Sequence, residues 1–173
     1  MSLVFLLGGA RSGKSSLAIE LARGWAGPVT VVATAEPGDL EMAERIRLHQ
    51  AERPSAWATI EEPLDLPEAF AKVADDDALI IECVSLWVAN MLARGDTDSE
   101  VEEHGRATAA LASSRRSLTI AVSNEVGLGI VPANEFGRRY RDVLGRVNAS
   151  WAAGADQTAL VVAGRILRLE NSL

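Results

Sequence analysis

The chain has 173 residues, of which 48% are hydrophobic and 24% are charged. This length and composition indicate a single globular domain over residues 1–173 with one substantial core, and they exclude a disordered or fibrous chain. The formal net charge of −7 argues against nucleic acid as the main partner, because phosphate backbones recruit clustered lysine and arginine.

Targeting and redox features of the sequence indicate a cytoplasmic protein. No apolar run reaches the roughly 20 residues that a membrane helix needs, so we expect no membrane span. The first apolar stretch, Leu3–Leu7, is too short for a signal peptide and has no basic leader, so we expect no export. The single cysteine, Cys83, has no partner for an internal disulfide, which fits a reducing compartment.

Short apolar runs alternate with longer amphipathic stretches along the chain. The apolar runs predict strands, in chain order, at Leu3–Leu7, Val29–Ala33, Ala78–Cys83, Leu118–Ser123, Thr158–Ala163 and Ile166–Leu169. The amphipathic stretches predict helices, in chain order, at Lys14–Trp25, Leu40–Glu52, Leu66–Ala74, Ser85–Ala93, Glu100–Ser113 and Asn134–Ala153. The polar and acidic segment Gly95–Gly105 is expected to be a solvated loop that leads into a helix.

The pattern of these elements predicts the fold class. The apolar runs are continuous rather than alternating, which indicates strands that are buried on both faces of a parallel sheet. Alternation of strands and helices predicts an α/β, doubly wound and mostly parallel sheet with helices on both faces. The last two strands are too closely connected for a parallel crossover, so we expect a hairpin that adds an antiparallel C-terminal edge strand.

A glycine-rich segment follows the first predicted strand and matches the phosphate-binding pattern G-x-x-x-x-G-K-[ST] at every position. Its residues are Gly8, Gly9, Ala10, Arg11, Ser12, Gly13, Lys14 and Ser15. Small residues let the backbone N–H groups turn inward onto phosphate oxygens, and the following helix adds its positive N-terminal end. We expect Lys14 to reach the β- and γ-phosphates and Ser15 to bind Mg²⁺, as in P-loop NTPases.

A P-loop protein needs a second acidic group near Mg²⁺, at the end of another buried strand. Three apolar residues followed by Glu82 meet this need, since a carboxylate there can hold the metal directly or through water. The alternative is a carboxylate that faces solvent at the end of a strand. The neighbouring Cys83 is interpreted as a small buried residue, because no base lies at a recognisable spacing for a nucleophile.

The predicted helix before Pro54 carries a histidine between two arginines. Arg45, His49 and Arg53 fall at i, i+4 and i+8, so they are expected to share one face. Two guanidiniums oppose protonation of the imidazole and could bind the phosphates of a nucleotide, which suits a covalent phosphoramidate. A surface helix with Glu–Arg pairs and an incidental histidine explains the same residues equally well. His104, in an acidic segment, is interpreted as solvated and uninvolved.

Four motifs together resemble one family. They are GGARSGKS at Gly8–Ser15, EMAERIRLHQAERP at Glu41–Pro54, SNEVGLGIVP at Ser123–Pro132 and RRYRDVLGRVN at Arg138–Asn148. The chain resembles the bifunctional adenosylcobinamide kinase and adenosylcobinamide-phosphate guanylyltransferase family of cobalamin biosynthesis from residue 3 to about residue 165. The phosphate loop alone is shared by many proteins, whereas the second and third motifs are more specific.

The resemblance implies a two-step enzyme. It would phosphorylate adenosylcobinamide, a corrinoid, with ATP or GTP, and then transfer GMP from GTP through a guanylylated histidine that corresponds to His49. It implies Mg²⁺ as cofactor, a homotrimer, and Lys14 and His49 as catalytic residues. Besides the phosphate loop, the residues that it would bring around the nucleotide are Ala33, Thr34, Ala35, Gln50, Ala51, Glu52, Arg53, Glu61 and Glu82.

Two questions stay open from the sequence alone. The segment Asn124–Gly129 follows a buried strand, so it lies at the phosphate-loop edge, either approached closely by a ligand or neighbouring chain or as a tight structural loop. The second question is the activity, since a P-loop kinase of another small metabolite or a regulatory P-loop ATPase has the same cradle. Only the guanylyltransferase requires His49 as a nucleophile.

Overall fold

The apolar runs of the sequence pair into one sheet. In the computed structural model, which describes residues 3–38 and 40–170 apart from the side chain of Arg45, seven strands pair in the order β3-β2-β4-β5-β1-β6-β7. They are β1 (Leu3–Gly8), β2 (Val29–Ala33), β3 (Ala58–Glu61), β4 (Ala78–Glu82), β5 (Thr119–Asn124), β6 (Gln157–Val162) and β7 (Arg165–Leu169). Neighbouring strands are parallel except β6 and β7, which are antiparallel. The predicted fold class is confirmed.

The edge strand β3 is absent from the sequence prediction, and omitting it was wrong. Its four residues pair in parallel with β2 and are largely exposed. The predicted strands rest on continuous apolar runs, which are typical of strands that are covered on both faces of the sheet. A short strand with a polar composition at the sheet edge carries no such run.

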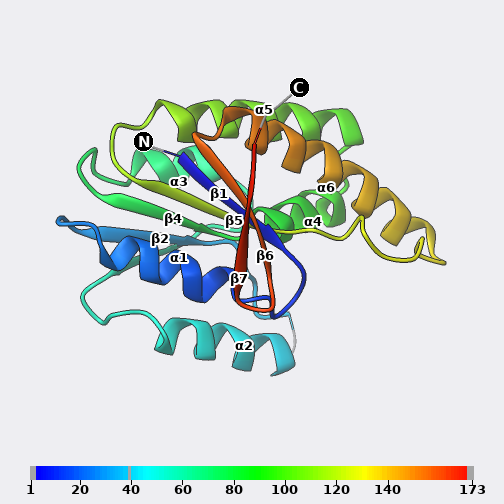
Figure 1. Cartoon of the computed structure of the whole chain (residues 1–173). Helices are drawn as coiled ribbons and strands as arrows, with labels where there is room; N and C mark the ends of the chain where they lie inside the picture. The colour runs from blue at the N-terminus through cyan, green and yellow to red at the C-terminus, as the bar shows by residue number, and fades with distance from the viewer. Residues whose placement is uncertain (1–2, 39, 171–173) are drawn as a thin grey trace.

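Helices cover both faces of the sheet. They are α1 (Lys14–Arg23), α2 (Leu40–Ala51), α3 (Leu66–Ala71), α4 (Val84–Arg94), α5 (Asp98–Ser114) and α6 (Glu135–Gly154). Figure 1 shows α1 and α2 on one side of the sheet and α3 to α6 on the other. None of the helices among the described residues has the length and apolar character that crossing a membrane requires.

Successive residues of the central strands contribute to two apolar layers. On β1, Phe5 packs with α4, α5 and α6, whereas Leu6 packs with Ala18 and Ala22 of α1. The larger layer contains the buried Trp87 of α4 and the buried Trp151 of α6. The ring centroids of Phe5 and Trp151 lie 6.0 Å apart. Packing on both faces therefore holds β1, the strand before the phosphate loop, in a defined position.

The helix α5 begins earlier than the composition predicts. Its N-cap Thr97 accepts a hydrogen bond from Glu100 N, and the Glu100 carboxylate accepts one from Thr97 N at 2.8 Å. Acidic residues in a first turn favour helix formation because they interact with the N-terminal end of the helix dipole. The helix predicted at Glu100–Ser113 is confirmed and begins two residues earlier, so the predicted loop ends before Asp98.

The C-terminal hairpin predicted from the sequence forms, and it contacts the phosphate loop. The turn between β6 and β7 has positive φ at Ala163 (50°) and Gly164 (72°), as a two-residue hairpin turn requires. Gly164 N donates a hydrogen bond to Ser12 O at 2.8 Å. Strands β6 and β7 therefore support the loop that follows β1.

Candidate active site

The phosphate loop connects β1 to α1 and has the backbone shape that its glycines predict. Gly8 has φ of 154° and lies so close to β6 that a Cβ atom there would be 2.3 Å from Val161 O. Gly13 has φ of 102°, a conformation that a side chain disfavours, and directly precedes the first residue of α1. Both glycines are therefore required by the geometry of the loop.

Lys14 lies inside this loop rather than on its surface. The residue is only 6% exposed, and its Nζ donates to Gly9 O at 2.7 Å and lies 3.4 Å from Ser12 Oγ. A buried ammonium at a helix N-terminus surrounded by backbone N–H groups favours a polyanion. The exposed tip of the loop consists of Gly9, Ala10 and Arg11.

Glu82, at the end of β4, is the centre of the site. Its Oε2 accepts a hydrogen bond from Arg53 at 2.7 Å, and its Oε1 lies 3.1 Å from His49 Nδ1. Burial raises the pKa of Glu82, but contacts with His49, Ser15 and Arg53 outweigh it and lower the pKa from 4.5 to about 2. The carboxylate therefore stays ionised, and it joins the phosphate loop to α2 and the segment that follows it.

The arrangement around His49 differs from the predicted helix face. The helix α2 ends at Ala51, so Arg53 lies beyond it, because a residue near a following proline leaves the helical conformation. Its guanidinium still reaches the carboxylate that His49 contacts, and only 7% of its side chain is exposed. The side chain of Arg45 lies outside the described part of the structure. Among the described side chains, the Glu82 carboxylate contacts His49, a neighbour that the predicted helix face did not include.

The other predicted nucleotide-binding residues gather at the same edge in different environments. Ala33 and Thr34 are buried, and the Thr34 hydroxyl donates to Cys83 O and accepts from Cys83 N, both at 2.8 Å. Thr34 therefore fixes the chain after Glu82 from within the protein. Ala35 is half-buried beside it.

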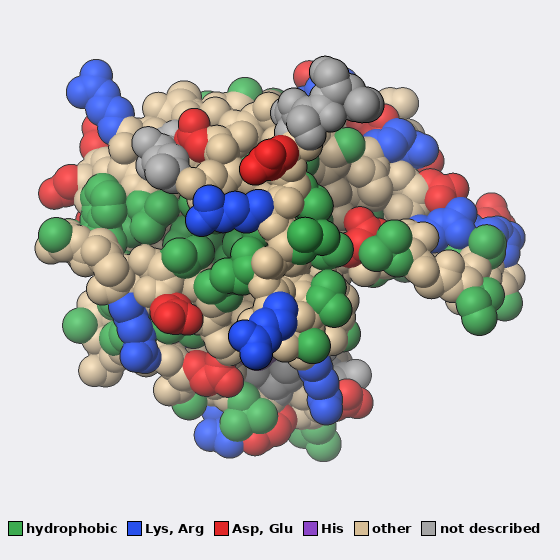
Figure 2. Space-filling model, in the orientation of Figure 1, with side chains coloured by type: hydrophobic (Ala, Val, Ile, Leu, Met, Phe, Trp, Pro, Cys, Tyr) green, Lys and Arg blue, Asp and Glu red, His purple; other side chains and the backbone are tan. Residues whose placement is uncertain are grey.

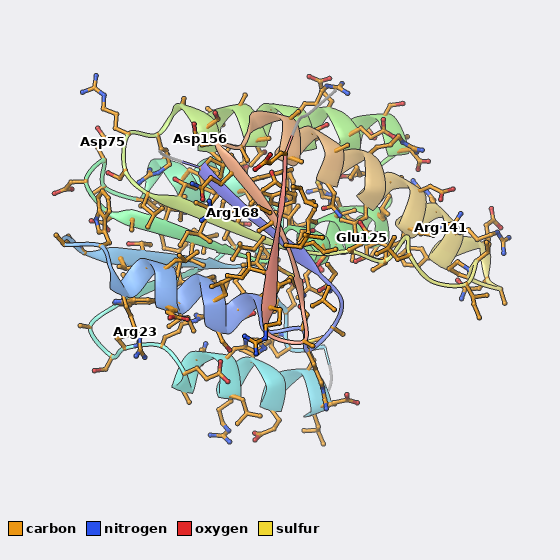
Figure 3. The ribbon with its side chains drawn as sticks, viewed as in Figure 1. Arg23, Asp75, Glu125, Arg141, Asp156 and Arg168 are labelled. Carbon is orange, nitrogen blue, oxygen red and sulfur yellow. The ribbon has the colours of Figure 1, made fainter. Side chains whose placement is uncertain are left out.

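The segment that follows His49 is open to solvent. Gln50 Nε2 lies 3.4 Å from Glu61 Oε1, and both residues are exposed, as is Ala51. Glu52 lines a groove of about 500 Å³ together with Ser16, Ile19, Glu20 and Arg23 of α1. Figure 3 labels Arg23 on the side of α1 that faces this segment. The structure thus brings all these residues to one side of the molecule, although they do not form one closed pocket.

Two interpretations of neighbouring residues are consistent with the structure. Burial raises the pKa of the Cys83 thiol, which disfavours the thiolate that a nucleophile needs. His104 is exposed on α5. Neither residue adds to the site.

Sequence reasoning missed a residue that shapes the site from α4. Asn90 Nδ2 donates to Thr34 O at 2.8 Å and to Pro63 O at 3.1 Å, so it joins the ends of β2 and β3 to α4. No local motif marks such a residue, because its partners are distant in sequence. Its only signal is a polar amide in the middle of a largely apolar helix.

The site has the donors that Mg²⁺ prefers. Among the described residues no three His, Cys, Asp or Glu side chains gather as a metal centre. Glu82 Oε1 is buried, and no described residue gives it a well-directed hydrogen bond. A carboxylate oxygen beside the Ser15 hydroxyl fits Mg²⁺, which binds through one or two protein oxygens together with phosphates and water.

Solved structures with the same fold define the class of protein. The assembled type III secretion ATPase EscN of enteropathogenic E. coli superposes with a TM-score of 0.58 at 13% identity, over 94% of this chain and 43% of that one. The KaiC-like protein PH0186 of Pyrococcus horikoshii superposes with a TM-score of 0.55 at 14% identity, over 92% of this chain and 70% of that one. At such low identity the likeness shows the fold alone, which is that of P-loop ATPases.

Sequence comparison identifies the family. Residues 4–169 match the family described as cobinamide kinase / cobinamide phosphate guanyltransferase, and the chain belongs to it. A "Bifunctional adenosylcobalamin biosynthesis protein CobP" of Pseudomonas aeruginosa is 39% identical over 167 residues, 96% of each chain. A "Bifunctional adenosylcobalamin biosynthesis protein CobU" of Salmonella typhimurium is 39% identical over 94% of this chain and 96% of the relative. The resemblance stated from the motifs is therefore confirmed.

Proposed function

We propose that this chain phosphorylates the aminopropanol hydroxyl of adenosylcobinamide with ATP or GTP and then transfers GMP from GTP to the new phosphate. The products of the second step are adenosylcobinamide-GDP and pyrophosphate. The observation that carries the proposal is the convergence of His49, Arg53 and Ser15 of the phosphate loop on Glu82. Membership of the family supports both activities.

In the first step, the phosphate loop holds the triphosphate. The buried Lys14 ammonium balances the charge that spreads over the transferred phosphoryl group, and the backbone N–H groups of the loop hold its oxygens. Ser15 and Glu82 would hold Mg²⁺, which neutralises phosphate charge when it is bound. This chain therefore contributes positioning and charge rather than covalent chemistry to the kinase step.

In the second step, His49 acts as the nucleophile. Its Nε2 attacks the α-phosphorus of GTP, the N–P bond forms, and pyrophosphate leaves as the bond to the bridging oxygen breaks. A phosphate oxygen of adenosylcobinamide phosphate then attacks the same phosphorus and releases His49. The Glu82 carboxylate beside Nδ1 favours the tautomer with its proton on Nδ1, which leaves the reactive lone pair on Nε2.

We also propose that the chain assembles as a homotrimer, as the resemblance implies. Large apolar side chains are exposed on the edge strand β7, where Ile166 is 55% and Leu167 is 59% exposed. Apolar surface of this kind on a sheet edge is typical of a protein interface. Figure 2 shows hydrophobic side chains grouped on the face that β6 and β7 cross.

The test of the proposed function is covalent labelling. Incubation with α-labelled GTP and Mg²⁺, without corrinoid, should give an acid-labile, base-stable label on the wild type and none on His49→Ala. The matched control is His104→Ala, which removes an exposed histidine on α5 and should label like the wild type.

Labelling also separates the proposal from its alternatives. A kinase of another metabolite or a regulatory ATPase would acquire no label. If the wild type stays unlabelled, or if His49→Ala labels as strongly as the wild type, the nucleotidyl-transfer mechanism is wrong.

A further inference from the structure

A carboxylate other than Glu82 lies at the phosphate-loop edge of the sheet. Strand β5 runs between β4, which ends at Glu82, and β1, which leads into the phosphate loop. In register, Glu82 is level with Val122, and Gly8 is level with Asn124. Glu125, the next residue, is therefore three positions further along β5 than the level of Glu82. At about 3.3 Å per residue, it extends roughly 10 Å further toward the open end of the sheet.

Backbone and side-chain contacts hold Glu125 next to the phosphate loop. Its N–H donates to Gly8 O at 3.1 Å, and Gly9 O, the next carbonyl, holds Lys14 Nζ. Its Oε1 accepts a hydrogen bond from Gly127 N at 2.5 Å. Figure 3 shows Glu125 where the chain leaves β5. The carboxylate is thus fixed one strand away from the lysine that the kinase step uses.

The other carboxylates at this edge are engaged or distant. Glu82 is bound to Arg53, and Glu62 accepts hydrogen bonds from two backbone N–H groups of its own turn. Glu36 follows β2 and Glu61 ends β3, and both strands lie further from β1 than β5 does. Glu125 is half-buried, and within residues 3–38 and 40–170 it takes part in no salt bridge. Among the carboxylates at this edge, Glu125 therefore directly follows the strand that pairs with β1.

The surface outside Glu125 is open to a large acceptor. Residues 126–134, here called the arm, lead from β5 to α6 and stand out from the body (Figures 1 and 2). On the arm, Leu128 is 82% and Ile130 is 96% exposed. The arm therefore offers exposed apolar surface to a large acceptor next to Glu125.

We propose that Glu125 is the catalytic base of phosphoryl transfer, an assignment that rests on the proposed kinase step. The acceptor hydroxyl gives its proton to the Glu125 carboxylate as its oxygen bonds to the γ-phosphorus. The bond from that phosphorus to the bridging oxygen breaks, and the nucleoside diphosphate leaves. Glu82 would hold Mg²⁺ and contacts His49, so the two carboxylates have separate tasks.

The test compares Glu125→Gln with the wild type in both half-reactions. Glutamine keeps an oxygen that can accept from Gly127 N, so the turn is retained while the base is lost. With adenosylcobinamide and ATP, kcat should fall roughly 10²–10⁴-fold, while KM for ATP changes less than about twofold. Guanylylation of the protein by α-labelled GTP should stay within about twofold of the wild type. Glu135→Gln, which alters an exposed carboxylate in the first turn of α6, is the matched control and should act like the wild type.

A second variant guards against loss of folding. Glu125→Ala should recover part of the lost kcat when formate is added, because formate can supply the missing base. The assignment is overturned if Glu125→Gln keeps its kinase kcat, if it loses guanylylation to the same extent, or if formate has no effect. If the wild type labels on His49 but phosphorylates no cobinamide, the kinase half of the proposed function fails, and Glu125 as its base fails with it.

Discussion

The phosphate loop and α2 meet at Glu82, but they are held in different ways. The loop follows a buried strand, and backbone contacts with β5 and with the β6–β7 turn fix it. No described residue of α2 is buried, and Leu40 and Leu48 are 91% and 50% exposed. Polar contacts from His49, Gln50 and the adjoining Arg53 connect α2 and the segment after it to the sheet. The phosphate loop is therefore preformed, whereas we expect α2, which carries His49, to have lower local stability.

The largest effect is expected from a substitution in the preformed phosphate loop, at Lys14. Lys14→Ala removes the buried ammonium of the preformed cradle, and we expect phosphorylation of adenosylcobinamide to fall roughly 10²–10³-fold. Steady-state assays with labelled ATP measure the loss. Lys72→Ala, at the other lysine of the chain, removes an exposed side chain paired with Glu68 and is the control. Full activity of Lys14→Ala would mean that the cradle is misassigned.

The contribution of Glu82, which joins the phosphate loop to α2, can be measured from the pH dependence of stability. The pKa of Glu82 is about 2 in the folded chain, compared with the ordinary value of 4.5 that applies in the unfolded chain. Its stabilisation is therefore present above pH 4.5 and is lost as the pH falls toward 2. The shift corresponds to about 3 kcal/mol. The wild type should lose this amount relative to Glu82→Gln between pH 5 and 2 in metal-free urea titrations, and parallel curves for the two proteins would contradict it.

The contact between Arg53 and Glu82 tests how the α2 segment is held against the sheet. Arg53→Ala removes a charged hydrogen bond from Glu82, which should lower the free energy of unfolding by about 2 kcal/mol. Hydrogen exchange should accelerate in α2, while exchange in α1 stays unchanged. The control is Arg47→Ala, which breaks only an exposed pair with Glu44. Unchanged exchange in α2 would show that another contact holds the helix.

The features that could be predicted from the sequence are those that depend on residues close together along the chain. The phosphate loop was predictable because its glycines, lysine and serine act within one contiguous turn after an apolar strand. Glu82 was predictable for the same reason, since it ends a run of apolar residues. The exposed strand β3 was missed because its pattern carries no burial signal.

Contacts between distant segments were beyond the sequence pattern. The pairing of Arg53 with Glu82 depends on how the chain leaves α2 before Pro54, and helical spacing suggested a different partner. The hydrogen bond from Glu125 N to Gly8 O depends on the order of strands in the sheet, which composition does not state. Such contacts join positions that become neighbours only when the sheet forms.

The β6–β7 turn has a consequence for synthesis of the protein. Strand β1 pairs with residues 119–124 and 157–160, and Ser12 receives its hydrogen bond from Gly164. A chain emerges from the ribosome N-terminus first, so the phosphate loop is synthesised early. The segments that hold it in place, which are β5, β6 and the β6–β7 turn, are synthesised much later. We therefore expect nucleotide to stabilise the chain through this loop only after the C-terminal hairpin has been released from the ribosome.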